Sequence, residues 1–118
     1  MTVASVGPNK LVKCSRGVKI EADVLIDEVK DRSFDAIILP GGMPGAQNLA
    51  ESATLKELLQ AQTQQQKLYG AVCASPVVAL QANGFLTTQK ATAFPTYSDK
   101  LANQTAVENS VGIALTLL

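Results

Sequence analysis

Cys73 is the residue whose setting most favours chemistry, because a cysteine thiolate is a strong nucleophile. A short apolar run at 68–72 precedes it, small residues surround it, and Pro76 opens a second apolar run. This order predicts a strand, a sharp turn and a helix with Pro76 in its first turn. Such a turn holds a side chain above the sheet edge beside free helix N–H groups, whose partial positive charge favours a thiolate. The alternative is that Cys73 is a small buried apolar residue.

Two glycines follow another apolar run. Residues 36–39 are continuously apolar, which is typical of a strand buried on both faces of a parallel sheet, and Gly41 and Gly42 come directly after Pro40. Glycines in this position indicate a tight turn or a close backbone approach, and an ordinary glycine turn is the simpler alternative. We expect bare backbone N–H groups at the carboxyl end of this strand, where ligands bind in open α/β sheets.

The two strand ends together predict a site. If the runs at 36–39 and 68–72 are neighbouring strands, Gly42 and Ala74 bring their backbone N–H groups close to Cys73. Two preorganised donors beside a nucleophile form an oxyanion hole. The same donors would equally bind the oxygens of an oxidised cysteine.

Cys14 is the second thiol, and Lys13 and Arg16 give it positively charged neighbours. We interpret it as a structural or interface thiol, with a possible secondary redox role that involves Arg16. The chain contains no histidine, which excludes a Cys–His dyad or triad within one chain. There is no zinc-ligand spacing, phosphate loop or dinucleotide fingerprint. We therefore expect neither a metal nor an organic cofactor.

Composition limits the class of protein. The 118 residues suit one domain, and a hydrophobic content of 47% excludes a disordered chain. Ten basic and ten acidic residues give a net charge of zero, so we expect no nucleic-acid or anionic-membrane partner. The apolar run at 110–118 is far shorter than the roughly 20 residues of a membrane span. Two cysteines and no N-terminal signal predict a cytoplasmic protein, unless an organelle transit peptide preceded the chain as given.

The hydrophobic pattern predicts one α/β domain at 1–118 with right-handed crossovers. Strands are expected at 1–6, 11–16, 17–20, 22–26, 36–39, 68–72 and 91–95, and helices at 45–50, 54–66, 76–82, 97–102 and 105–118. Thr54 fits a capping box for the second helix, and Ser52 is a rival cap. One face of that helix carries, at helical spacing, Leu55, Leu58, Leu59 and Gln62.

Several of these segments resemble, in order and spacing, motifs of the ThiJ/PfpI superfamily. They resemble in particular the branch of the Parkinsonism-associated protein deglycase and its bacterial and plant relatives. The resemblance covers residues 1–101. The matching segments are 14–18, 39–42, 45–49, 51–52, 71–76, 91–95 and 99–101.

The resemblance implies a flavodoxin-like three-layer α/β sandwich with a mainly parallel sheet, assembled as a homodimer. It implies that Cys73 is the nucleophile, that Gly42 and Ala74 supply backbone N–H groups, and that Gly41 shapes the turn. The implied activities are a cofactor-independent glyoxalase or protein deglycase acting on a small aldehyde or a glycated protein. Redox sensing through cysteine oxidation and holdase chaperone action are the other activities that the resemblance implies.

The chain departs from the family pattern in two places. Family members begin with a strand and a helix whose glutamate hydrogen-bonds the cysteine as acid/base, and this sequence begins after that unit. A strand and a Gly-Pro-Gly loop are expected before Thr105, so we predict an internal gap near 104/105. Three explanations fit, namely a splice or gene-model variant, ordered segments joined across gaps, or an intended minimal fragment. The first explanation would leave an incomplete sheet whose exposed edges tend to pair with other chains.

Three functions follow from these departures. The first is an α-oxoaldehyde enzyme that lacks its family glutamate. The second is a redox sensor and holdase, which needs only an exposed and reactive Cys73. The third is an inactive interaction partner of full-length family members.

Overall fold

The computed structural model describes residues 1–103, so the helix predicted at 105–118 and the gap predicted near 104/105 lie outside the described residues. The strands are β1 (Ala4–Ser5), β2 (Leu11–Lys13), β3 (Lys19–Glu21), β4 (Val24–Leu25), β5 (Ala36–Leu39) and β6 (Leu68–Ala71). The helices are η1 (Ser15–Gly17), η2 (Ile26–Val29), α1 (Gly45–Glu51), α2 (Ala53–Gln64), η3 (Pro76–Gln81) and α3 (Pro95–Ser98). Among them η3 is a π-helix, and η1 and η2 are 3₁₀ turns.

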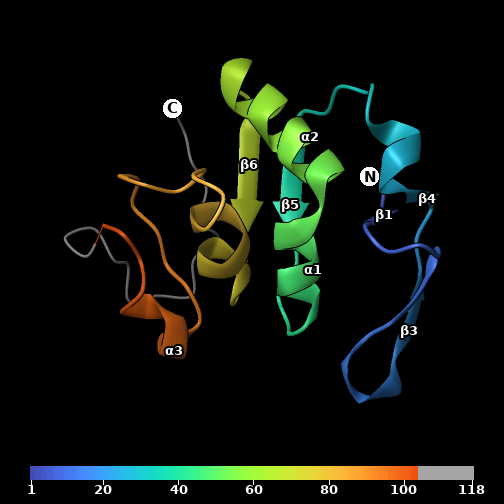
Figure 1. Cartoon of the computed structure of the whole chain (residues 1–118), viewed down its shortest axis with the longest axis horizontal. Helices are drawn as coiled ribbons and strands as arrows, with labels where there is room; N and C mark the ends of the chain where they lie inside the picture. The colour runs from blue at the N-terminus through green and yellow to red at the C-terminus, as the bar shows by residue number, and fades with distance from the viewer. Residues whose placement is uncertain (104–118) are drawn as a thin grey trace.

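The six strands form three separate pairs (Figure 1). β5 and β6 are parallel, with Ala36 opposite Leu68 and Leu39 opposite Ala71. β1 and β4 are also parallel, whereas β2 and β3 form an antiparallel hairpin. The condition set for the predicted site, that the runs at 36–39 and 68–72 are neighbouring strands, is therefore met, and the two strands are parallel as expected of this sheet.

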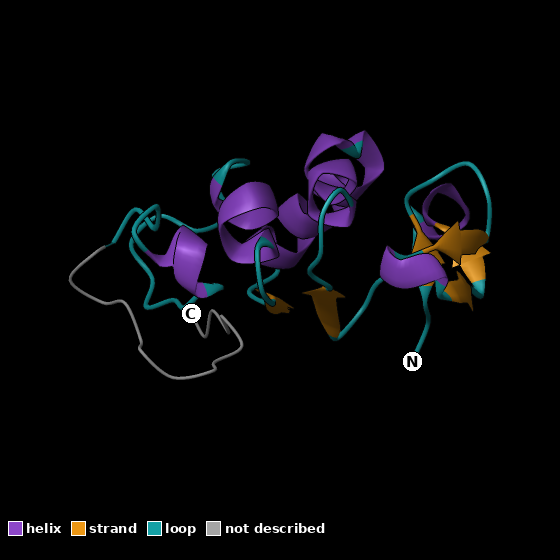
Figure 2. Cartoon of the chain, turned by 90° about the horizontal axis from the view of Figure 1, so that it is seen from below, coloured by secondary structure: helices purple, strands orange, loops and turns teal. Residues whose placement is uncertain are grey.

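Helix α2 packs against one face of the β5–β6 pair, and α1 packs against η3. The view from below shows helices on one side of these two strands (Figure 2). The α2 side chains predicted to share a face are all buried, and Tyr69 of β6 is buried near them. The Tyr69 hydroxyl donates to the Phe85 carbonyl at 2.8 Å, so its one polar atom is satisfied. This core fixes β5 and β6 beneath the helices. It contains Ile26, Leu39, Leu55, Leu58, Leu59, Tyr69, Ala71, Ala79, Leu80, Leu86, Ala91 and Leu101.

The cap of α2 resolves the two alternatives. The Ser52 hydroxyl accepts a hydrogen bond from the Leu55 N–H at 3.2 Å, so Ser52 is the N-cap. The Thr54 capping box is wrong, because the Thr54 hydroxyl donates instead to the Asp27 carboxylate at 2.5 Å.

Two other predictions fail. The run at 36–39 is not buried on both faces, since Ile38 is 53% exposed, and no strand of residues 1–103 pairs with its second edge. Residues 91–95 form no strand beyond an isolated bridge at Ala91, because Pro95 begins α3 and Phe94 bonds to the turn after β6. Within the described part of the chain, no helix is long and apolar enough to cross a membrane.

Candidate functional site

Cys73 occupies the turn between β6 and η3 and is exposed to solvent. Its φ angle is +61°, a left-handed conformation that a residue with a Cβ rarely adopts. A single strained residue of this kind costs on the order of 1–3 kcal/mol and persists where its surroundings hold it. The interpretation of Cys73 as a small buried apolar residue is therefore wrong.

Gly41 and Gly42 fit around this turn for different reasons. A Cβ on Gly41 would lie 2.4 Å from the Cys73 Cβ and 3.3 Å from its Sγ. The backbone can approach Cys73 this closely only because glycine has no side chain. Gly42 has no crowding neighbour but adopts a φ of +89°. The prediction that the glycines lie beside Cys73 is confirmed for Gly41, and the place of Gly42 beside the sulfur stays a prediction. Both alternatives offered for the pair apply, the close approach at Gly41 and the turn at Gly42.

Three hydrogen bonds hold the turn. The Val72 N–H donates to the Leu39 carbonyl at 3.1 Å and extends the β5–β6 pairing by one residue. The hydroxyl of Ser75, which is fully buried, donates to the Pro40 carbonyl at 2.5 Å. The Phe94 N–H donates to the Cys73 carbonyl at 2.8 Å. Two strand ends and a distant loop thus fix the backbone of the cysteine.

The carbonyls of Gly42 and Ala74 are used within the protein, but their N–H groups are not. The Gly42 carbonyl accepts from the Ala46 N–H at 2.8 Å, and the Ala74 carbonyl accepts from the Val78 N–H at 2.9 Å. Within residues 1–103, neither the Gly42 nor the Ala74 N–H has a hydrogen-bond partner. Both N–H groups keep their donor capacity, and their joint action on one oxygen stays a prediction.

The Cys73 sulfur has no side-chain partner in the described residues, and no carboxyl group hydrogen-bonds it there. Metal-ligating side chains likewise form no group of three or more anywhere in residues 1–103. The arrangement can therefore offer a nucleophilic sulfur and backbone donors, and no carboxyl group of residues 1–103 is hydrogen-bonded to that sulfur.

Cys14 and Arg16 lie apart from the Cys73 turn, at the tip of the β2–β3 hairpin. Cys14 is partly exposed and its Sγ is 3.9 Å from the Val12 carbonyl, while Arg16 is exposed with a φ of +59°. A cavity of about 390 Å³ has Cys14 on one wall and Gly41 on another, but Cys73 does not line it. The secondary redox or interface role of Cys14 stays a prediction.

Sequence reasoning missed Ser75 and Phe94, the two residues that tie the turn down. Ser75 directly follows Ala74, so a small polar residue inside an apolar run was a usable signal for a buried hydrogen bond. Phe94 gave no such signal, because it contributes its backbone N–H and its side chain is 49% exposed.

Known proteins resemble this chain along nearly its whole length. Protein DJ-1 homolog B of Arabidopsis thaliana is 44% identical over 111 residues, which cover 94% of this chain and 25% of that protein. Glutathione-independent glyoxalase DJR-1.2 of Caenorhabditis elegans is 43% identical over 90 residues, which cover 76% of this chain and 47% of that protein. The solved structure of oxidized Toxoplasma gondii DJ-1 superposes with a TM-score of 0.89 at 38% identity, covering 98% of this chain and 65% of that one.

The chain spans about a quarter of the length of the plant relative and about two thirds of the Toxoplasma structure. The high TM-score assigns it the flavodoxin-like α/β fold of these neighbours. Residues 1–114 match the DJ-1/PfpI family. This protein belongs to the DJ-1/PfpI family.

Proposed function

We propose that this protein detoxifies α-oxoaldehydes through Cys73, as a cofactor-independent glyoxalase or protein deglycase. The observation that carries the proposal is the exposed, left-handed Cys73 packed against Gly41, while the N–H groups of Gly42 and Ala74 have no hydrogen-bond partner within residues 1–103. The glyoxalase relative in C. elegans supports this reaction class. The proposed substrate is a small aldehyde or the glyoxal adduct of a protein.

The proposed reaction with methylglyoxal begins when the Cys73 thiolate adds to the aldehyde carbon. A C–S bond forms, and the carbonyl π electrons become an alkoxide that the Gly42 and Ala74 N–H groups stabilise. A proton then leaves the former aldehyde carbon and another is delivered to the neighbouring carbon, which gives a thioester. Water cleaves the thioester and releases lactate and the free thiol, so the reaction consumes one water and has no net redox change.

The proton transfer is the weak step of this chain. It needs a general base of suitable pKa, and such a group typically contributes 10²–10⁴-fold to the rate. Because no carboxyl group of the described residues bonds to the Cys73 sulfur, we propose that addition is efficient and turnover is slow. The protein would then accumulate as the adduct of Cys73.

A second candidate is cysteine-based redox sensing. The exposure of the sulfur favours it, and the Toxoplasma relative was solved in an oxidized form. Two equivalents of a peroxide would oxidise the Cys73 thiol through the sulfenic to the sulfinic acid, and each peroxide is reduced as it gives up one oxygen atom. We propose that the N–H groups of Gly42 and Ala74 donate to the two oxygens of the product. The holdase role and the homodimer are proposals that accompany this candidate.

The first experiment compares methylglyoxal consumption by the wild type, Cys73→Ser and the matched control Cys14→Ser. We expect Cys73→Ser to fall to the background rate and Cys14→Ser to keep the wild-type rate, because Cys14 lies outside the turn. Intact mass spectrometry should show the aldehyde adduct on the wild type and on Cys14→Ser. Equal consumption by all three proteins contradicts the proposal.

Mild peroxide tests the redox candidate on the same three proteins. We expect two oxygen atoms to be added at Cys73 before Cys14 reacts. If Cys14 oxidises first, or if both thiols stay reduced, the redox candidate fails while the aldehyde proposal stands.

A further inference from the structure

We infer that Asn83 is a spontaneous modification site, which the chain converts to aspartate or isoaspartate when the contact between α1 and η3 opens. Asn83 and Gly84 lie in the turn that follows η3, and they are the one Asn-Gly pair of the sequence. The backbone nitrogen that follows an asparagine can attack its side-chain carbonyl carbon. Glycine hinders this attack least, because it has no side chain.

The reaction needs water and no other reactant. The Gly84 nitrogen loses its proton and forms a bond to the Asn83 Cγ, while the bond from Cγ to the side-chain nitrogen breaks. Ammonia leaves with that proton, and a five-membered imide ring remains. Water then opens the ring at either of its two carbonyl carbons, which gives aspartate or isoaspartate. The sum consumes one water, releases one ammonia and changes no oxidation state.

The folded chain opposes the first step at both reacting groups. The Gly84 N–H donates to the Gln81 carbonyl at 2.9 Å, so its proton is held in the turn. The Asn83 Nδ2 donates to the Ala79 carbonyl at 2.9 Å and to the Ala50 carbonyl at 3.0 Å. These bonds fix the carboxamide and engage both hydrogens of the leaving group. Attack therefore requires the turn to open.

The Asn83 carboxamide also connects two helices. Ala50 lies in the last turn of α1, and Asn83 directly follows η3, which packs beside α1 (Figure 1). An aspartate at this position would present only acceptor oxygens to two carbonyl oxygens, so neither hydrogen bond could form again. An isoaspartate would lengthen the main chain of the turn by one methylene group. Either product therefore prevents the open contact from closing as before.

This connection concerns both halves of the Cys73 turn. Helix α1 begins shortly after Gly42, and η3 begins shortly after Cys73. The hydrogen bond from Asn83 thus joins the helix that follows the glycines to the helix that follows the cysteine. Because only the open form reacts, the modified fraction increases with the total time that the contact has spent open. Neither step of the reaction involves the Cys73 sulfur, so the modification is independent of the proposed aldehyde chemistry.

The first experiment incubates the whole chain at mildly alkaline pH in native buffer and in urea that unfolds it. Mass spectrometry of the peptide that contains Asn83 detects the exchange of NH₂ for OH, and electron-transfer dissociation separates aspartate from isoaspartate. We expect conversion in urea and a rate about tenfold or more lower in the folded chain. Asn48, which precedes a leucine, should convert more slowly than Asn83 in urea. Equal rates for Asn83 in the two buffers, or no conversion in urea, overturn the inference.

A second experiment tests the effect of the product. We expect a lower Tm for Asn83→Asp than for the matched control Asn9→Asp, which adds the same charge at an exposed position. If Asn83→Asp does not fold, the modified fraction of the aged wild type is separated by ion exchange through its added negative charge. Hydrogen exchange at the Gly84 and Phe85 amides of that fraction should then be faster than in the unmodified protein. Unchanged exchange, or a Tm of Asn83→Asp equal to that of Asn9→Asp, contradicts the inference.

Discussion

The two parallel strand pairs of this molecule differ in how completely they are supported. β5 and β6 pack against α2, and hydrogen bonds from Val72, Ser75 and Phe94 close the turn at their carboxyl ends. β1 and β4 are only two residues long, and the adjoining β2–β3 hairpin exposes large apolar side chains. The exposed fractions are 56% for Leu11, 38% for Val12, 56% for Val18 and 50% for Ile20.

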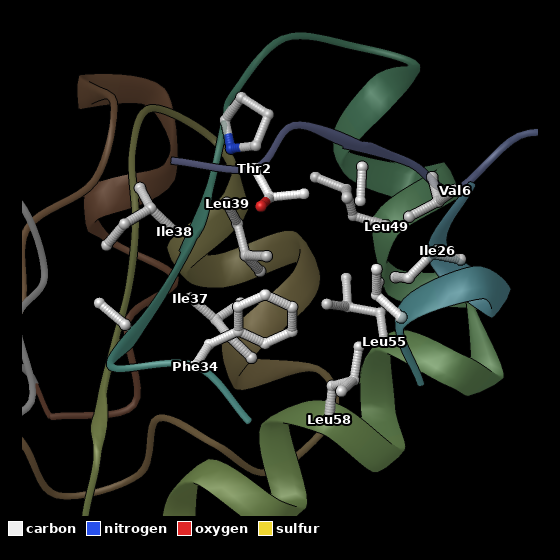
Figure 3. A pocket seen from close by; sticks show the side chains of 14 residues that line it. Thr2, Val6, Ile26, Phe34, Ile37, Ile38, Leu39, Leu49, Leu55 and Leu58 are labelled. Carbon is white, nitrogen blue, oxygen red and sulfur yellow. The ribbon is translucent and has the colours of Figure 1, made fainter. Parts of the chain in front are cut away.

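The candidate site lies on the pair β5–β6, which has the more extensive packing and hydrogen bonding of the two. Cys73 keeps its left-handed backbone because the residues around it are fixed by contacts within the described chain. Within residues 1–103, β1 pairs only with β4, its neighbours Thr2 and Val6 line a cavity (Figure 3), and the adjoining hairpin exposes apolar side chains. We therefore expect substitutions around β5 and β6 to lower the free energy of unfolding much more than substitutions around β1 and β4.

The largest effect is expected for Gly41→Ala. The new Cβ would lie 2.4 Å from the Cys73 Cβ and 3.0 Å from the Val72 carbonyl oxygen, so the turn must shift. Overpacking of this kind costs about 1–3 kcal/mol or more, measured as the free energy of unfolding in urea. Alkylation of Cys73 by iodoacetamide should also change in rate.

Gly45→Ala is the matched control, because nothing lies within 4 Å of its new Cβ and Gly45 begins α1. We expect it to be neutral or slightly stabilising, since alanine favours a helix by about 0.5–1 kcal/mol over glycine. Equal destabilisation by the two variants would contradict the close packing of Gly41 on Cys73.

Ser75→Ala should have an intermediate effect. It removes a fully buried hydroxyl and leaves the Pro40 carbonyl without that donor. The expected loss is about 1–3 kcal/mol in the free energy of unfolding. Ser15→Ala, at an exposed position in η1, is the control and should stay within about 0.5 kcal/mol of the wild type. If Ser75→Ala unfolds like the control, the Ser75–Pro40 hydrogen bond does not hold the turn.

The smallest effects compare one chemical change in both regions. Val77→Thr puts a hydroxyl on a partly buried side chain packed against the core, and we expect a loss of about 1 kcal/mol. Val18→Thr makes the same change at a side chain that is 56% exposed, so it should be within about 0.5 kcal/mol of the wild type. Thermal unfolding of the two variants measures the difference in stability loss between the two regions. A larger loss for Val18→Thr than for Val77→Thr would contradict the expected difference.

The strands and glycines that carry the site could be predicted because their signals are local. A continuous apolar run followed by Pro-Gly-Gly predicted one strand end, and an apolar run followed by a cysteine and Pro76 predicted the other. The pairing of β5 with β6, which brings Gly41 to Cys73, was only a condition of that prediction and is seen in the structure. The choice between Ser52 and Thr54 as a cap could not be made, because Asp27, which bonds Thr54, is 27 residues away in the sequence. The strand predicted at 91–95 was wrong for the same reason, because the hydrogen bond from the Phe94 N–H to the Cys73 carbonyl is a long-range contact.

The bond between the Phe94 N–H and the Cys73 carbonyl gives the turn a reporter. The amide proton of Phe94 has a chemical shift that depends on the length of this bond, and its exchange with solvent requires the bond to open. Any event at the sulfur that moves the backbone of Cys73, such as an adduct, an oxidation or a neighbouring substitution, is therefore transmitted to one resonance 21 positions along the chain. A single nuclear-magnetic-resonance peak can follow the chemical state of the cysteine without a label on it.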